Sequence, residues 1–126
     1  MGLDTSHDCW HGPYSAFMSF RTAIARLVGI PNLREMEGFC DNGKPWTGFD
    51  ENDPMFVFLT HSDCDGEIGC EHQLELADRL EALVTALRTT DAIEMVHKCY
   101  SFADRAQQFA DGLRRAHALG EPVNFH

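Results

Sequence analysis

The chain has 126 residues, of which 44% are hydrophobic, and a formal net charge of −10 at neutral pH. This length is typical of a single domain (1–126) with its own core. The acidic balance argues against binding to a nucleic acid polymer, which requires a basic surface. No apolar run approaches the about 18 residues of a membrane span, so no membrane partner is expected.

The N-terminal residues and the cysteines bear on the cellular compartment. The sequence MGLDTSHDCWHG has neither the basic nor the apolar region of a signal peptide. The five cysteines are an odd number, so they cannot all pair within the chain. We therefore expect a cytoplasmic protein with reduced thiols.

The first predicted element is a helix over residues 13–28. Pro13 suits the first helical position and Gly29 suits the position after the end, with apolar residues at helical spacing between them. Residues 30–53 lack periodicity and predict a long irregular loop, a candidate lid or binding loop. Trp46 in this loop could cover a pocket or fix the loop to the core.

Three further elements follow the loop. Residues 54–60 suit a short helix capped by Asp53, although the apolar run also suits a buried strand. Long helices are predicted over 71–89 and 91–118. The tail PVNFH could add an edge strand, with the N-terminal GLD as a candidate partner. The predicted fold class is mainly α, a small helical bundle of about three long helices with at most short edge strands.

The segment THSDCDGEIGCEH, residues 60–72, invites comparison with an EF-hand loop. With Gly66 at the sixth position, His61 and His72 occupy the first and twelfth positions, where calcium requires oxygen ligands. The segment is at best a degenerate EF-hand-like loop. A zinc site formed by His61, Cys64, Cys70 and His72 has a spacing that matches no zinc module we can justify.

A divalent metal of another kind suits this segment better. Residues 45–78 contain nine carboxylates and no Lys or Arg, so the acids either spread into solvent or converge on a cation. Imidazole together with carboxylate is a ligand set of transition metals. We therefore predict a site for Mn, Mg or Zn, with these metal ligands: Asp63, Asp65 and Glu67.

A second polar cluster, SHDCWHGPY, occupies residues 6–14 before the first helix. Histidine titrates near neutral pH and serves as a general acid or base. An arginine two turns into the helix could pair with a phosphate, and aromatic rings could stack on a base. The predicted catalytic residues are His7, His61 and His11; the predicted substrate-binding residues are Trp10, Tyr14, Arg21 and Trp46. Taken singly, each histidine also fits an ordinary surface or capping role.

The N-terminal MGLDTSH…GPYSAFMSFR and the central FLTHSDCDGEI resemble a family of small uncharacterised proteins of bacterial and phage genomes. The resemblance covers both polar clusters and about half of the chain. It implies a shared pattern that comprises His7, Tyr14, Arg21, His61, Asp63, Asp65 and Glu67. By analogy, a phage setting would suit a small acidic protein that destroys or sequesters host nucleotide signals.

Three hypotheses about function follow. The first is a metal-assisted phosphodiesterase-type hydrolase that acts on a nucleotide or cyclic nucleotide. The second is a nucleotide-binding module, phage-encoded in the analogy above, that sequesters its small anionic ligand without chemistry. The third is an acidic interaction protein whose central loop binds a basic partner. The sequence leaves a homo-oligomer open.

Overall fold

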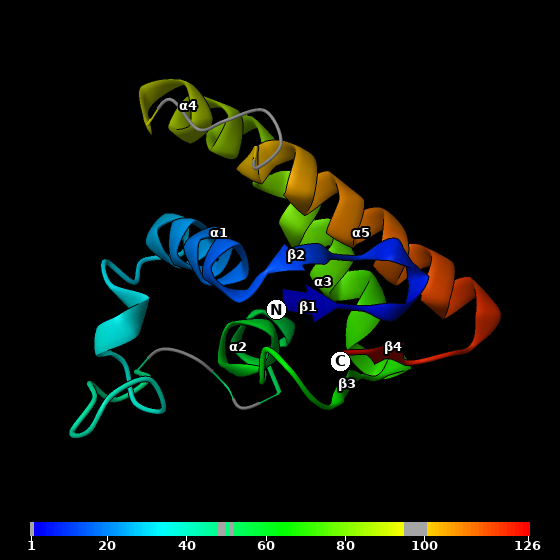
Figure 1. The fold of residues 1–126 in the computed structure, drawn as a ribbon, viewed down its shortest axis with the longest axis horizontal. Coiled ribbons are helices and arrows are strands. Elements are labelled where there is room, and N and C mark those ends of the chain that lie inside the picture. The colour runs from blue at the N-terminus through cyan, green and yellow to red at the C-terminus, as the bar shows by residue number, and fades with distance from the viewer. Residues whose placement is uncertain (1, 48–49, 51, 95–100) are drawn as a thin grey trace.

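The computed structural model describes residues 2–47, 50, 52–94 and 101–126 (Figure 1). In this part of the chain five α-helices are present: α1 (Tyr14–Leu27), α2 (Pro54–Thr60), α3 (Cys70–Ala82), α4 (Val84–Glu94) and α5 (Phe102–Leu119). The predicted mainly α class is confirmed, whereas the predicted number of about three long helices is wrong. None of the described helices is long and apolar enough to cross a membrane.

Helix α5, the longest described helix, runs back alongside α4 and α3 (Figure 1). The predicted helix over 71–89 is divided at Leu83, which ends α3. No glycine or proline marks this break, so the sequence periodicity runs through it. Arg114 of α5 forms ion pairs with Asp78 and Glu81 of α3, at 2.9 and 2.6 Å. These pairs fix the two helices side by side.

The predicted helix over 91–118 is likewise two elements, and its residues 95–100 lie outside the described part of the chain. Asp91 ends up in α4, where its carboxylate accepts hydrogen bonds from the backbone N–H groups of Phe102 and Ala103 at 2.9 and 3.1 Å. Ser101 caps α5 by accepting from the Asp104 N–H. The free N–H groups of the first turn are thus satisfied by α4 and by the cap, and α5 begins at Phe102.

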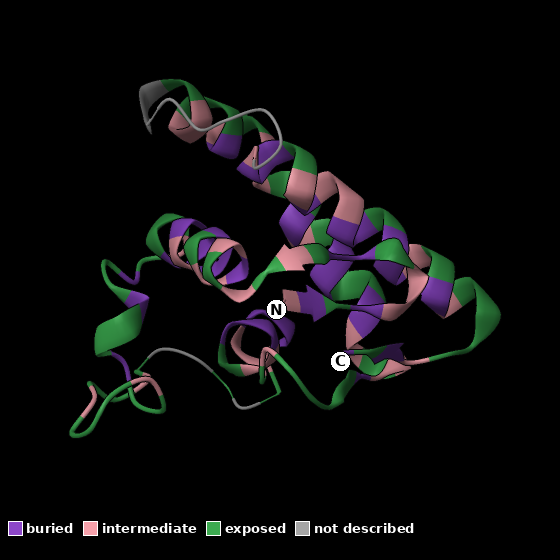
Figure 2. Ribbon diagram, viewed as in Figure 1, coloured by how far each residue is buried: buried purple, intermediate pink, exposed green. Residues whose placement is uncertain are grey.

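Helices α1 and α2 close the core from the other side, as Figure 2 shows by their buried inner faces. Phe17 and Phe20 of α1 contact Phe58 of α2, with ring centroids 6.0 and 6.1 Å apart. Phe58 in turn packs edge-on against Phe109 of α5 at 5.2 Å. Helix α2 begins at Pro54 with the Asp53 side chain as its cap, so the prediction of a short helix at 54–60 is confirmed.

The strands are short, and all except β3 lie near the two chain ends. Strand β1 (Gly2–Asp4) pairs antiparallel with β2 (His11–Pro13), and β3 (Glu67–Ile68) pairs antiparallel with β4 (Val123–Asn124). The chain end also bridges to the N-terminal segment through Thr5 and Phe125. The predicted tail strand therefore forms, with the central segment as its main partner and the N-terminal segment as its second.

A tight turn between β1 and β2 lies on α5. It contains the 3-10 helix η1 (Ser6–Asp8), where His7 and Asp8 have φ values of 60° and 57° in the left-handed region. The backbone oxygens of this hairpin accept from the α5 side chains of Arg115, Gln108 and Arg105 at 2.9, 2.9 and 3.0 Å. These contacts hold a strained backbone in place.

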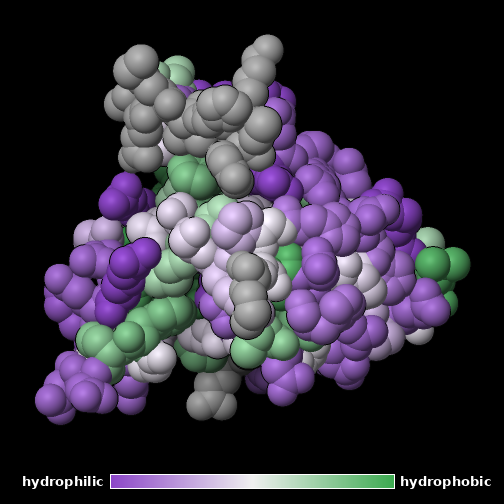
Figure 3. All heavy atoms as spheres, in the orientation of Figure 1, coloured by the Kyte–Doolittle hydropathy of each residue, from purple (hydrophilic) through white to green (hydrophobic). Residues whose placement is uncertain are grey.

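The segment 30–53 is mainly irregular, as predicted, and contains only the 3-10 helix η2 (Leu33–Glu35) among its described residues. Trp46 donates its indole N–H to the Glu37 oxygen at 2.8 Å, and its ring packs edge-on against Phe56 of α2 at 5.3 Å. Trp46 thus connects the loop to α2. Hydrophilic side chains cover the side of the molecule that contains α5 and the β1–β2 hairpin, whereas apolar ones gather nearer the irregular loop (Figure 3).

Candidate functional site

Arg21 is a buried cation at the centre of the most promising site. It lies on α1 and is only 3% exposed. Its Nη1 donates to the backbone oxygens of Phe58, Leu59 and His61 at 3.3, 3.2 and 2.6 Å. These oxygens belong to the last turn of α2, where unpaired carbonyl groups concentrate partial negative charge. Arg21 therefore caps α2 from a neighbouring helix.

The charge of Arg21 is only partly compensated. Burial lowers the pKa of its guanidinium to about 10, with Asp63 acting in the opposite direction, so the group stays charged at neutral pH. The guanidinium carbon Cζ of Arg21 lies 4.7 Å from the ring centroid of Phe17 and 5.7 Å from that of Phe39. Its Nε is buried and has no hydrogen-bond partner in the described structure. A buried donor without a partner is costly and points to a missing acceptor.

A pocket of about 280 Å³ opens over Arg21. It lies between α1, the irregular loop and the end of α2, and therefore joins segments that are far apart in the sequence. Apolar, hydroxyl and carboxylate groups surround the cation. The pocket is lined by Met18, Arg21, Glu37, Gly38, Phe39, Thr60, His61, Ser62 and Asp63.

His61 forms part of this wall and connects it to the chain end. Its Nδ1 lies 2.8 Å from the Ser62 oxygen and its Nε2 lies 3.0 Å from the Glu67 oxygen. Its ring packs on Phe125 with centroids 4.1 Å apart. Both ring nitrogens face backbone carbonyl oxygens, so in this arrangement neither is free to accept a proton from a substrate.

The three predicted metal ligands lie along the segment after His61 without converging. Asp63 is half-buried at the pocket, whereas Asp65 and Glu67 are exposed. Asp65 accepts from the Gly66 N–H at 2.8 Å, which stabilises the turn. Within the described residues, no group of three or more His, Cys, Asp or Glu side chains is arranged to hold a metal. The metal assignment therefore stays a prediction from the sequence.

The N-terminal polar cluster forms a separate surface. His7 places Nε2 3.0 Å from Glu121 and Nδ1 2.7 Å from the Ser6 hydroxyl. His11 lies between two carboxylates, with Nδ1 2.8 Å from Asp4 and Nε2 3.0 Å from Asp8. The hydrogen bonds to Asp4 and then Asp8 raise the pKa of His11, and the bond to His11 lowers the pKa of Asp8.

The aromatic and thiol groups of this cluster belong to the core. Trp10, which the sequence suggested as a base-stacking residue, is 1% exposed and packs against Phe17 and Phe20 at 5.1 and 5.2 Å. A buried ring has no surface to offer a ligand. Tyr14 is half-buried at the start of α1 and packs against the core. Cys9 is buried, and this burial raises the pKa of its thiol to about 12, which disfavours the nucleophilic thiolate.

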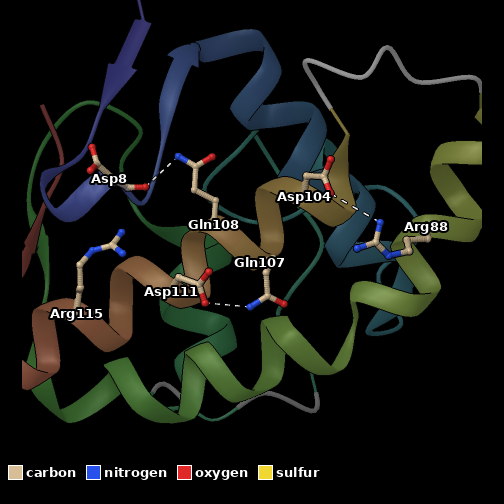
Figure 4. A pocket seen from close by; sticks show the side chains of 7 residues that line it. All are labelled: Asp8, Arg88, Asp104, Gln107, Gln108, Asp111 and Arg115. Atoms are coloured by element: carbon tan, nitrogen blue, oxygen red, sulfur yellow. Dashed lines mark hydrogen bonds and ion pairs between the residues drawn. The ribbon is translucent and has the colours of Figure 1, made fainter.

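A second hollow of about 350 Å³ lies between η1, α4 and α5 (Figure 4). Figure 4 shows that its side chains contact one another: Gln108 reaches the Asp8 backbone, Gln107 reaches Asp111, and Arg88 faces Asp104. The lining contains no apolar side chain. Small-molecule sites are mostly apolar with a few polar groups, so this hollow is a poorer candidate than the Arg21 pocket.

The structure thus distributes the predicted site residues over separate places. The C-terminal strand lies between the two polar segments. Asn124 donates its backbone N–H to the Ser6 hydroxyl at 2.9 Å, and Phe125 donates its backbone N–H to the Gly66 oxygen at 2.9 Å. The sequence assigned roles to Arg21, His61 and Asp63, which line the pocket, but none to Phe39 and Glu37, which line it too. The only available signal was that the long loop places an aromatic and a carboxylate two residues apart.

The chain matches no family model, no curated protein and no solved structure.

Proposed function

We propose that the protein is a binding module for a small ligand whose anionic group pairs with Arg21. The observation that carries this proposal is the buried guanidinium at the pocket, with one N–H left without a partner. Guanidinium binds carboxylate and phosphate through charge-assisted hydrogen bonds, which are strongest where water is excluded. The nucleotide predicted from the sequence is one member of this ligand class.

The arrangement of the three histidines supports binding over hydrolysis. His7 pairs with Glu121, His11 with Asp4 and Asp8, and the His61 ring with backbone oxygens. Hydrolysis would require a proton-transfer group within hydrogen-bond reach of the substrate, and each of these rings is already engaged. The metal-assisted phosphodiesterase stays a prediction from the sequence. It differs from the binding module in that it would cleave the ligand that it binds.

The test is the affinity for single amino acids, mononucleotides and inorganic phosphate, measured from changes in the NMR chemical shifts of the backbone amides. Binding in the pocket should displace the signals of Gly38, Ser62 and Asp63, and Arg21→Lys should weaken binding about tenfold or more because the fork of donors is lost. Arg34→Lys makes the same substitution at an exposed arginine of the irregular loop 30–53 and serves as the matched control. Recovery of the ligand unchanged after prolonged incubation, with and without Mg, Mn or Zn, supports binding; its cleavage would establish the hydrolase instead.

A further inference from the structure

We infer that the ligand of the Arg21 pocket is a compact zwitterion, such as a free α-amino acid, which carries a carboxylate and an ammonium group on neighbouring atoms. This inference rests on the proposed function and specifies the class of its ligand. It is carried by the combination of charges around the pocket: one buried cation together with two carboxylates, beside apolar side chains.

The charges of the lining fit a zwitterion better than a phosphate. Arg21 is the only Lys or Arg in the lining, which also includes the acidic residues Glu37 and Asp63. The charges of Asp63 and Arg21 interact, since Asp63 raises the pKa that burial lowers at Arg21. A phosphate dianion would meet both the cation and two like charges, within a chain whose net charge is −10. A zwitterion presents a carboxylate to the guanidinium and an ammonium group to a carboxylate of the lining.

The polar and apolar parts of the pocket then have distinct roles. The ligand carboxylate pairs with the Arg21 guanidinium, whose side chain lines the pocket. The ligand ammonium pairs with Asp63, which is half-buried at the same pocket. Met18 and Phe39 offer an apolar surface for the ligand side chain.

The size of the pocket points in the same direction. Its volume of about 280 Å³ lies just below the roughly 300–1,000 Å³ typical of small-molecule sites. A single amino acid has a compact shape that suits such a space. A cyclic dinucleotide, one of the substrates considered from the sequence, carries two bases and two phosphates and would extend well beyond it.

The experiment compares charged and capped forms of one ligand. Each of the twenty standard amino acids is first titrated singly against the full chain, followed by amide NMR. The strongest binder is then compared with its N-acetyl form, which lacks the ammonium, and with its amide, which lacks the carboxylate. We expect each capped form to bind about tenfold or more weakly, the size of a lost charge-assisted hydrogen bond.

Two variants identify the group that recognises the ammonium. Asp63→Asn should weaken binding of the free amino acid about tenfold but leave the weak binding of the N-acetyl form nearly unchanged. Asp65→Asn removes the same charge two residues away at an exposed position outside the pocket and should leave both affinities unchanged. Both substitutions lie on the loop after α2, so the fold should persist in each, as the amide spectrum will show.

The outcomes separate the inference from the function on which it rests. If guanosine monophosphate or inorganic phosphate binds through Arg21 while free amino acids do not, the zwitterion is excluded and the anion-binding function stands. Equal affinity for the free and N-acetyl forms excludes it in the same way. If none of these probes displaces the signals of Gly38 and Ser62, or if Arg21→Lys leaves binding intact, both proposals fall.

Discussion

The protonation of His11 is tied to two neighbouring carboxylates. Its two ring nitrogens meet Asp4 and Asp8, and both carboxylates accept only. The doubly protonated ring is therefore the form that satisfies both contacts. Arg105 and Arg115 of α5 also reach this hairpin, at the backbone oxygens of His11 and His7.

We predict that His11 makes folding stability depend on pH. Its folded-state pKa is raised above the ordinary value of 6.5, so its contribution is fully present below that value and is lost as the pH rises through the folded-state pKa. The pKa of Asp8 is lowered from 3.8, so its contribution is lost as the pH falls through its own folded-state value. In urea unfolding, His11→Gln should destabilise the protein more at pH 5.5 than at pH 9. A cost that is equal at the two pH values would contradict the pairing.

Cys9 gives a second prediction at the residue scale. Its thiol is buried with a pKa raised to about 12, whereas Cys40 and Cys64 are exposed. Brief treatment of the native protein with iodoacetamide should modify Cys40 and Cys64 and leave Cys9 largely unmodified, as measured by peptide mass spectrometry. Modification of Cys9 as fast as Cys64 would show that the Cys9 thiol is accessible and would contradict its burial.

At this scale the sequence predicts residue types better than their surroundings. Arg21 was assigned to substrate binding and Asp63 to a metal site, and both line one pocket. Trp10 was assigned to ligand binding because its aromatic ring could stack on a base, yet its large apolar surface is buried among phenylalanines. Local sequence cannot show which residues of a distant helix will cover a side chain.

At the scale of elements, Gly112 allows the N-terminal hairpin to lie directly on α5. A Cβ at this position would approach the His7 oxygen to 2.8 Å and would contact the Cys9 sulfur at a still shorter distance. Real Cβ atoms do not tolerate such approaches, so either the hairpin or the helix would have to move.

We predict that Gly112→Ala destabilises the protein by about 1–3 kcal/mol through overpacking. Helix propensity alone would act in the opposite direction, since alanine is more favourable than glycine by about 1 kcal/mol in a helix interior. The sign of the change in the free energy of unfolding, measured by urea denaturation, therefore decides between the two effects. A more stable variant would show that the hairpin does not pack as closely as described.

The elements also show where periodicity is insufficient. The short helix α2 was predicted correctly because Asp53 and Pro54 mark its start. The long helical runs were predicted correctly in kind and wrongly in number. Helix α3 ends at Leu83 without a glycine or proline. The start of α5 has a local signal in its capping residue Ser101, but it also depends on Asp91, a partner from another helix. A cap contributed by tertiary structure leaves no local signature.

At the scale of the whole molecule, the C-terminal strand connects the N-terminal hairpin to the central segment. Phe125 is 3% exposed and contacts the rings of Phe17 and His61, at 6.1 and 4.1 Å. It also bridges to Thr5 on one side and donates its N–H to the Gly66 oxygen on the other. The tail was predicted as an optional edge strand because two or three residues carry too little pattern to identify their partners.

We predict that Phe125→Ala lowers the free energy of unfolding by about 3–5 kcal/mol, the usual cost of removing a buried phenylalanine side chain. Leu119→Ala is the matched control, because Leu119 lies near the same chain end and is 65% exposed. It should change stability by less than about 0.5 kcal/mol. Similar effects of the two substitutions in chemical denaturation would mean that the tail does not anchor the fold.

The pocket over Arg21 is also a property of the whole molecule, since it combines α1, the irregular loop and the end of α2. The measurement that tests its function most directly is the ¹⁵N NMR signal of the Arg21 side chain during titration with the strongest-binding amino acid. We predict that the chemical shift of that signal changes and reaches a plateau as ligand is added, and that the amide signals of Gly38 and Ser62 shift along with it. An Arg21 signal that stays unchanged while the ligand saturates the protein would place binding elsewhere and would contradict the proposed function.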